Sequence, residues 1–251
     1  MNQIAFVTGA TSGIGEATAR LLAKNNFDLI ICGRREGKLQ EMKQELSKDV
    51  KVDALCFDVK DKEATFQAIN MLPDDFKLVD VLINNAGNAH GLSPIQDGDV
   101  DDWDSMIDIN VKGLLYVSKA LVPGMVARKH GHIVNIGSIA GKEVYPGGNV
   151  YCASKYAVDA LNKGMLADLY QHGIKVSAVN PGLVDTGFSM VRFKGDEEKS
   201  KRVYEGMTPL TGEDIAEIIL FIITRPAHVN LHDVMVLPTA QASATLVKRI
   251  K

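Results

Sequence analysis

Seven short apolar runs, separated by longer stretches, constrain the fold of this chain more than any other feature. They cover residues 4–8, 27–32, 52–57, 79–84, 132–138, 175–180 and 234–237. Most are rich in Val, Ile or Leu without polar alternation, which is typical of strands buried on both faces of a parallel sheet. Helical patterning predicts right-handed crossovers between them, over residues 13–25, 37–47, 62–71, 100–129, 150–171 and 213–224. We therefore expect an α/β fold with a doubly wound parallel sheet of about seven strands and helices on both faces.

No stretch of the 251 residues has the composition of a linker, so we expect one domain over residues 1–251. The most irregular segment, residues 182–209, mixes glycines, charged residues and two phenylalanines. Long insertions without secondary structure in a compact domain are usually functional. This segment is therefore predicted to be a substrate-binding lid within the domain.

Composition excludes several classes of function. The 28 Lys and Arg residues against 31 Asp and Glu give a net charge of −3, whereas a nucleic-acid binder normally carries a basic excess. No apolar run is long enough for a membrane span, and the first ten residues lack the features of a secretory signal. Three cysteines without metal-ligand spacing suit a reducing compartment. We expect a cytoplasmic protein that binds neither nucleic acid nor membrane and holds no metal.

A glycine-rich turn follows the first predicted strand, where residues 8–15 read TGATSGIG. Glycines at a strand-to-helix turn let the backbone approach a pyrophosphate, and the helix N-terminus supplies unpaired N–H groups and a positive dipole. The alternative is an ordinary tight turn, which the preceding strand and the following helix disfavour. The candidate cofactor contacts in this turn are Gly9, Thr11, Ser12, Gly13, Ile14 and Gly15.

Two arginines, Arg34 and Arg35, follow the second predicted strand. NAD-binding proteins normally place an acidic residue here, on the ribose hydroxyl, whereas two guanidinium groups suit the 2′-phosphate of NADP. The alternative is a solvated pair of surface arginines. The position favours NADP (NADPH) as the cofactor. Asp58, after the third strand, is a candidate contact to the adenine amino group.

Tyr151 and Lys155 are four residues apart in a helix-patterned stretch and so share one helix face. A tyrosine normally titrates near about 10, too high for acid–base chemistry at neutral pH, and a nearby ammonium favours the phenolate. Ser138 ends the fifth predicted strand, where the ligand crevice of an open α/β sheet lies. These three residues are therefore candidates for an acid–base site.

With these motifs the sequence resembles the classical short-chain dehydrogenase/reductase family over essentially the whole chain. Residues 84–87, which read NNAG, and the pair Pro181 and Gly182 match further motifs of that family. The resemblance implies a single-domain Rossmann-type fold. Further cofactor contacts that it implies are Val59, Asn85, Ala86, Gly87, Pro181, Gly182, Val184 and Thr186, with Tyr151 and Lys155.

The resemblance also implies a role for each reactive residue. It makes Tyr151 the acid/base, while Lys155 lowers its pKa and holds the nicotinamide ribose. It assigns Ser138 to orienting the carbonyl oxygen. Asn110 matches the fourth member of the catalytic set, which supports a proton-relay water.

Less generic segments, at residues 147–151, 191–196 and 226–230, are similar to the NADP-dependent 3-hydroxy acid dehydrogenases of this family. That group includes serine or L-allo-threonine dehydrogenase and malonic semialdehyde reductase, and related aldehyde reductases acting on sulfonates share much of the pattern. Arg192, in the predicted lid of an acidic chain, is a candidate clamp for a carboxylate. The alternative is a solvated surface arginine.

The leading hypothesis is a reversible NADP(H)-dependent oxidoreductase that interconverts a small 3-hydroxy acid and its 3-oxo acid or semialdehyde, with Ser138 and Arg192 contacting the substrate. One alternative is a reductase of other carbonyls, such as sulfonated aldehydes or bulkier ketones. Another is a non-catalytic NADP-binding sensor, which the intact acid–base residues disfavour. The expected partner is a small-molecule substrate, a small carboxylate, and the resemblance implies a homotetramer.

Overall fold

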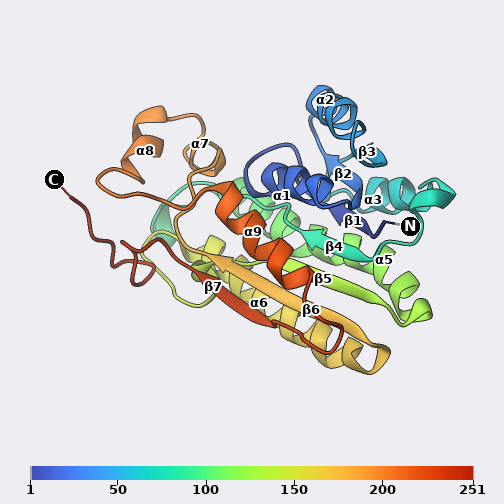
Figure 1. Ribbon diagram of the computed structural model, residues 1–251. Helices are drawn as coiled ribbons and strands as arrows, with labels where there is room; N and C mark the ends of the chain where they lie inside the picture. Colours follow the sequence, from blue (N-terminus) through green and yellow to red (C-terminus); the bar gives the residue numbers. More distant parts are fainter. Residues whose placement is uncertain (1, 251) are drawn as a thin grey trace.

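The computed structural model of the protein describes residues 2–250 and contains, within them, one sheet of seven parallel strands (Figure 1). The strands lie in the order β3-β2-β1-β4-β5-β6-β7, so the direction of winding reverses between β1 and β4. They are β1 (Ile4–Val7), β2 (Asp28–Gly33), β3 (Val52–Cys56), β4 (Val81–Asn84), β5 (Gly131–Ile136), β6 (Ile174–Pro181) and β7 (Asp233–Val236). Each strand begins and ends within two residues of its predicted range. The predicted doubly wound fold is confirmed.

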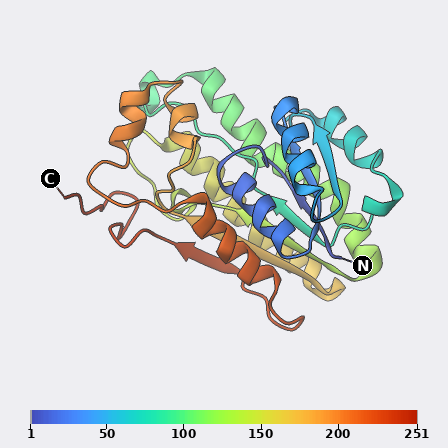
Figure 2. The same cartoon turned by 45° about the horizontal axis from the view of Figure 1, so that its top comes forward.

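Helices cover both faces of the sheet (Figures 1 and 2). The helices that bury apolar side chains against one face are α1 (Gly13–Lys24), α2 (Glu36–Leu46) and α9 (Gly212–Ile223). Those that cover the other face are α3 (Lys62–Asn70), α5 (Leu114–Arg128) and α6 (Asn149–Leu169). α9 lies beside α1, although the two are far apart in sequence. Burial on both faces explains why the central strands lack polar alternation.

The predicted helix at residues 100–129 is interrupted, which corrects the sequence interpretation. α4 (Val100–Ile107) and α5 are joined by a π-helical turn at Asp108–Gly113. Such turns are rare and frequently occur at functional sites. Gly113 passes so close to Val59 that a Cβ on it would lie 2.7 Å from the Val59 Cγ2 atom. Over six residues a π-helical turn and an α-helix have nearly the same hydrophobic pattern, so the sequence did not distinguish them.

The segment at residues 182–209 is more regular than the sequence indicated. It contains two short helices, α7 (Phe188–Arg192) and α8 (Glu197–Arg202), and Gly195 between them has a φ of 90°. The Asp196 side chain caps α8 by accepting the Lys199 N–H. Helices of one or two turns are too short for a hydrophobic period to be visible, so the sequence predicted an irregular segment. Its role as a substrate-binding lid stays a prediction.

Among residues 2–250, no helix combines the length and the apolar character that crossing a bilayer requires. The same residues include no group of three or more His, Cys, Asp or Glu side chains placed to hold a metal ion. All three cysteines are unbridged; Cys32 and Cys152 are buried and Cys56 is exposed.

His132, in β5, is a buried imidazole within the sheet. Its Nε2 atom lies 2.8 Å from Ser177 Oγ on β6, and its buried Nδ1 atom has no hydrogen-bond partner among the described residues. Burial, with the charge of Lys175, lowers the pKa of His132 from 6.5 to about 3. Between these two values the unfolded chain binds more protons than the folded chain, so His132 destabilises the fold increasingly as the pH falls below 6.5.

Replacing His132 by Gln should therefore reduce the loss in the free energy of unfolding as the pH falls. At about pH 4.5, protonation of His132 in the unfolded chain lowers the free energy of unfolding by about 3 kcal/mol. His132→Gln does not have this loss, because glutamine does not bind a proton in this pH range. Urea unfolding of both proteins from about pH 7.5 to 4.5 measures the difference, which should move in favour of the variant as the pH falls. The carboxyl groups titrate alike in both proteins, so a difference that does not change with pH would contradict a neutral buried His132.

Candidate active site

The glycine-rich turn between β1 and α1 forms a cradle of backbone donors at the carboxyl edge of the sheet. Gly9 and Gly13 have φ values of 64° and 53°, which other residues rarely adopt, and a Cβ on Gly15 would lie 2.4 Å from the Gly9 carbonyl oxygen. Ser12 is the N-cap of α1, but its side chain makes no capping bond, so the first N–H groups of the helix keep their capacity for an anion. Ile14 is partly buried and packs against the apolar core. The cradle fits a pyrophosphate.

The residues after β4 hold this turn in place. The Thr8 hydroxyl oxygen accepts the N–H groups of Asn85 and Ala86, both at 2.9 Å, and Asn85 Nδ2 donates to the Thr8 carbonyl at 2.8 Å. Gly87 lies beside a reactive side chain, because a Cβ on it would lie 3.7 Å from Lys155 Nζ. The predicted contacts at 85–87 therefore connect the glycine turn with the reactive residues.

Arg34 and Arg35 have different partners. Arg35 Nη2 donates to the Thr11 carbonyl at 2.9 Å and to the Thr11 hydroxyl at 2.8 Å, which fixes Arg35 on the glycine turn. The Arg34 side chain is 64% exposed, and its Nη1 atom lies 3.6 Å from Asp58 Oδ2. Val59, next to Asp58, is buried. Both arginines are exposed, and Arg34 is the one whose guanidinium makes no hydrogen bond to the glycine turn.

Tyr151, in the first turn of α6, is the buried phenol of the site. It is only 8% exposed, and burial raises its pKa above the ordinary value, which the nearby Ser138 hydroxyl and the charge of Arg192 partly oppose. Ser138 follows β5, and its Oγ accepts the Ala140 N–H at 3.1 Å at the start of a 3₁₀ turn. The structure thus brings Tyr151 and Ser138 together.

Lys155 lies one helical turn after Tyr151 and is also buried. Its Nζ donates to the Ile136 carbonyl at 2.9 Å, and burial lowers its pKa from 10.5 to about 8. The ammonium is therefore bonded to the end of β5 rather than to the phenol. The lowering of the Tyr151 pKa by Lys155 stays a prediction.

Asn110 is held in the π-helical turn by its side-chain amide. Its Oδ1 accepts the Asn88 N–H at 2.8 Å, and its Nδ2 donates to the Asn88 carbonyl at 2.9 Å and to Ser154 Oγ at 3.0 Å. Ser154 precedes Lys155 on α6. The amide is satisfied by protein groups, so Asn110 bridges the α4–α5 connection and the helix that carries the reactive residues.

The turn at Pro181 and Gly182 leads from β6 into the predicted lid. A Cβ on Gly182 would lie 2.2 Å from Gln241 Oε1, and the same oxygen accepts the Leu183 N–H at 2.8 Å. Gln241 is buried and ties the C-terminal segment to this turn. The sequence analysis missed Gln241, because only its tertiary contacts distinguish it from a surface glutamine.

Val184 and Thr186 connect the predicted lid to its surroundings. The Val184 carbonyl accepts the Tyr204 hydroxyl at 2.8 Å. Thr186 reaches the glycine turn, since a Cβ on Gly13 would lie 3.0 Å from Thr186 Cβ. Thr186 is therefore adjacent to the proposed pyrophosphate cradle.

Arg192 enters the site from α7. Its Nε donates to the Gly91 carbonyl at 3.2 Å, its Nη2 to the Tyr145 hydroxyl at 2.9 Å, and its guanidinium carbon lies 5.5 Å from the centroid of the Tyr151 ring. Phe188, on the same helix, packs on Tyr151 with ring centroids 5.7 Å apart. The structure thus places a cation beside the phenol. Tyr145 and Gly91 were missed in the sequence because neither belongs to one of the motifs.

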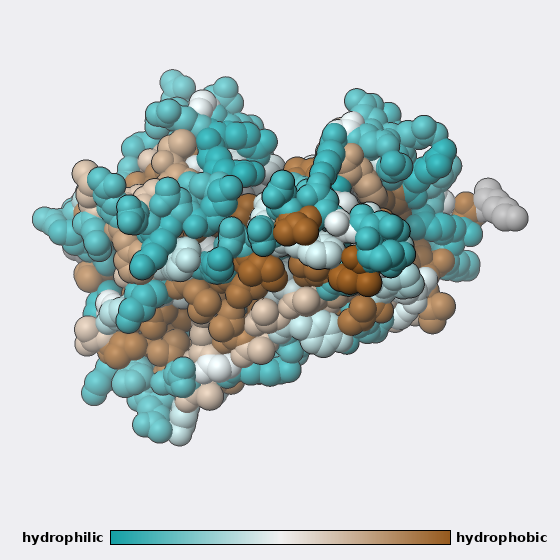
Figure 3. All heavy atoms as spheres, turned by 180° about the vertical axis from the view of Figure 1, so that it is seen from behind, coloured by the Kyte–Doolittle hydropathy of each residue, from teal (hydrophilic) through white to brown (hydrophobic). Residues whose placement is uncertain are grey.

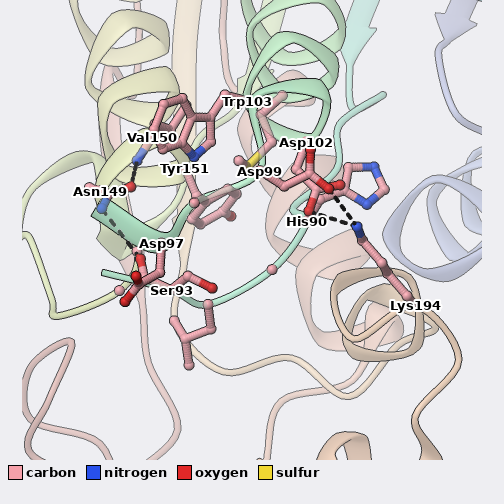
Figure 4. Close-up of a pocket in the computed structure, with 16 residues that line it drawn as sticks. His90, Ser93, Asp97, Asp99, Asp102, Trp103, Asn149, Val150, Tyr151 and Lys194 are labelled. Atoms are coloured by element: carbon pink, nitrogen blue, oxygen red, sulfur yellow. Dashed lines mark hydrogen bonds and ion pairs between the residues drawn. The ribbon is translucent and has the colours of Figure 1, made fainter. Parts of the chain in front are cut away.

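A cavity of about 230 Å³ opens beside Tyr151 (Figure 4). One wall is formed by residues 90–106 and another by residues 147–151. Lys194 closes its edge, with Nζ 3.0 Å from Asp102 Oδ2 and 3.3 Å from Asp99 Oδ2. The Lys194 ammonium is thus paired with two carboxylates. Within the predicted lid, Arg192 is the cation that lies against the Tyr151 ring.

The glycine turn and the buried phenol occur together in a known family of proteins, which the sequence matches. A family model described as short chain dehydrogenase matches residues 3–197. The chain belongs to the short-chain dehydrogenase family. The predicted oxidoreductase class is thereby confirmed together with the fold.

Several relatives of this dehydrogenase are similar over nearly their whole length. The NADP-dependent 3-hydroxy acid dehydrogenase YdfG of Salmonella typhi is 46% identical over 244 residues, which are 97% of this chain and 98% of the relative. Sulfoacetaldehyde reductase 2 of Chromohalobacter salexigens is 45% identical over 243 residues, 96% of each chain. A solved structure described as the closed form of serine dehydrogenase complexed with NADP⁺ is 42% identical, covers 99% of this chain and 100% of its own, and superposes with a TM-score of 0.93. The predicted resemblance to 3-hydroxy acid dehydrogenases is confirmed.

Proposed function

We propose that this short-chain dehydrogenase is a reversible NADP(H)-dependent oxidoreductase that interconverts a small 3-hydroxy acid and its 3-oxo acid or semialdehyde. The observation that carries the proposal is the place of Arg192, whose guanidinium carbon lies 5.5 Å from the Tyr151 ring centroid. A fixed cation beside the acid–base phenol favours a substrate with an anionic group a few bonds from the reacting carbon. The name of the relative from Salmonella typhi supports the same substrate class.

The crevice fits NADP(H). The N-terminus of α1 offers N–H groups to a pyrophosphate, and Arg34 offers an accessible guanidinium to a 2′-phosphate. When bound, NADP(H) supplies or accepts the hydride. The names of the relatives, which are NADP-dependent or complexed with NADP⁺, support this cofactor. The other residues proposed to contact it are Gly9, Thr11, Ser12, Gly13, Ile14, Gly15, Arg35, Asp58, Val59, Asn85, Ala86, Gly87, Tyr151, Lys155, Pro181, Gly182, Val184 and Thr186.

Tyr151 is the group that moves the proton in this proposal. During reduction the phenol donates its proton to the carbonyl oxygen, and during oxidation the phenolate accepts it back. Burial keeps the proton on the Tyr151 oxygen at neutral pH, and the Ser138 hydroxyl binds the same substrate oxygen. Lys155, with a pKa of about 8, is mainly protonated at neutral pH and lowers the cost of forming the phenolate. Asn110 keeps the π-helical turn attached to α6.

The cavity beside Tyr151 is lined by neither Ser138 nor Arg192, so its volume does not decide between small substrates and bulkier ketones. Sulfonated aldehydes remain an alternative, because a guanidinium also binds a sulfonate and one relative is named a sulfoacetaldehyde reductase. The buried Tyr151, Ser138 and Lys155 disfavour a non-catalytic sensor.

The same chain is proposed to assemble as a homotetramer. Apolar side chains gather in a band across the face of the molecule opposite to that in Figure 1 (Figure 3). α5 and α6 lie on that side of the sheet, and each carries an exposed apolar side chain, Leu115 and Tyr156. Exposed apolar patches mark association surfaces. The cytoplasmic location stays a prediction from the sequence.

Tyr151→Phe tests the acid–base role, because it removes the proton donor and keeps the ring. Turnover should fall about 100- to 10,000-fold, while the affinity for NADPH changes less than about threefold. Steady-state oxidation of NADPH and fluorescence titration measure the two quantities. The matched control is Tyr170→Phe, an exposed tyrosine beyond the end of α6, which should keep normal turnover. Normal turnover by Tyr151→Phe would refute the assignment.

Arg34→Ala tests the 2′-phosphate contact. Loss of one charge-assisted contact should raise the Kd of NADPH roughly 10- to 100-fold and leave the Kd of NADH within about threefold. Arg35→Ala is the comparison variant, because Arg35 holds Thr11 in the glycine turn and its loss should weaken both cofactors. Fluorescence titrations with both cofactors measure the effects. Equal losses for NADPH and NADH in Arg34→Ala would contradict the contact.

Arg192→Ala tests the acidic substrate. The kcat/KM for 3-hydroxy acids should fall roughly 10- to 100-fold, whereas that for an uncharged alcohol of the same length should stay within about threefold. Lys201→Ala serves as control, since this exposed lysine pairs with Glu197 on its own helix α8, and it should change neither value much. A sulfonated aldehyde belongs in the same panel. If the wild-type protein has a higher kcat/KM for that aldehyde than for the semialdehyde, the proposed 3-hydroxy acid substrate is wrong and a sulfonated aldehyde takes its place.

A further inference from the structure

Tyr145, in the loop between Ser138 and α6, is a partly buried phenol to which none of the motifs assigns a role. Its hydroxyl oxygen accepts the Arg192 Nη2–H at 2.9 Å, and the Arg192 guanidinium carbon lies 5.4 Å from the centroid of its ring. The other side of the residue packs against the start of α6, because a Cβ on Gly148 would lie 2.1 Å from the ring. The Tyr145 ring is therefore fixed between the backbone before α6 and a cation from α7.

Arg192 and Tyr145 each keep one donor for a ligand. Arg192 uses Nε for the Gly91 carbonyl and Nη2 for Tyr145, so its Nη1 has no hydrogen-bond partner within residues 2–250. Tyr145 accepts a bond from Arg192, but its own hydroxyl proton is given to no acceptor among those residues. Two adjacent donors match two oxygens of one carboxylate or sulfonate group.

The protonation states of the two side chains suit an anion. Burial raises the pKa of the Tyr145 phenol, so at neutral pH the group is an uncharged donor rather than a repelling phenolate. Arg192 contributes the guanidinium donors that suit a carboxylate or sulfonate. The same guanidinium carbon lies 5.5 Å from the Tyr151 ring centroid, so an anion on this pair would lie close to the reacting atoms.

We propose that Tyr145 is a specificity-determining residue that, together with Arg192, binds the anionic group of the substrate. The inference rests on the proposed function. Tyr145 belongs to the loop after β5, whereas Arg192 belongs to α7, so the anion site is complete only while α7 lies against that loop. Because Tyr145 holds the end of the substrate that does not react, its hydroxyl acts on KM and leaves kcat nearly unchanged.

Tyr145→Phe tests the proposal, since it retains the ring that packs on Gly148 and removes only the hydroxyl. The KM for 3-hydroxy acids should rise roughly tenfold or more, kcat should change less than about threefold, and an uncharged alcohol of matched length should be unaffected. Tyr156→Phe is the matched control, because the Tyr156 hydroxyl donates to the Lys142 carbonyl on the exposed side of α6. Thermal unfolding of all variants checks that the fold is intact.

The double variant Tyr145→Phe with Arg192→Ala tests whether the two side chains act on the substrate as one unit. If the two side chains bind one anion, the losses on 3-hydroxy acids should be less than multiplicative, and strictly multiplicative losses would overturn the pairing. Equal losses on acids and uncharged alcohols in Tyr145→Phe would show a purely structural role. Either result overturns this inference but leaves the proposed function standing, provided that Arg192→Ala loses activity on acids and not on uncharged alcohols. If neither variant loses more activity on acids than on uncharged alcohols, the proposed function is refuted. A matched sulfonated aldehyde shows which anion the pair prefers.

Discussion

Helices bury both faces of the seven-stranded parallel sheet. The edge formed by the carboxyl ends of the strands is therefore where the backbone and side chains can contact a ligand. Every residue of the candidate site either follows a strand at that edge or is carried to it by a helix. The hydroxyl of Thr8 shows how closely the strands are coupled there, because it accepts two N–H groups from the segment after β4. The position of the glycine turn, and with it the cofactor cradle, therefore depends on strand pairing deep in the core.

The proposed chemistry depends on a buried phenol that has a cation beside its ring and a lysine one helical turn further along α6. Lys155 approaches from its own helix and Arg192 from α7, while Ser138 approaches from the end of β5. Burial disfavours a charge on Tyr151 and the charge of Arg192 partly opposes this, while the contribution of Lys155 stays a prediction. The π-helical turn contributes indirectly, since Asn110 joins it to Ser154 on the helix that carries Tyr151 and Lys155.

Much of this arrangement was predictable from sequence, and the rest was not for physical reasons. The apolar runs predicted every strand, because burial on both faces imposes that pattern, and the motifs placed Tyr151 and Lys155 on one helix face. The π-helical turn was not visible, because Val59 against Gly113 is a tertiary contact. Tyr145 and Gln241 were missed for the same reason, as their partners are far along the chain. Helices α7 and α8 are too short to leave a periodic signal.

The bond between Arg192 and Gly91 joins segments 101 residues apart, and the backbone adds a second bond, from the Gly91 N–H to the Arg192 carbonyl at 2.9 Å. Lys194 adds ion pairs to Asp99 and Asp102 in the same region. In the proposed reaction, these contacts hold α7 over Tyr151 and separate the bound product from bulk water. Strengthening them would tighten substrate binding and slow product release, so the proposed lid role ties the turnover rate to how readily α7 moves away from the site.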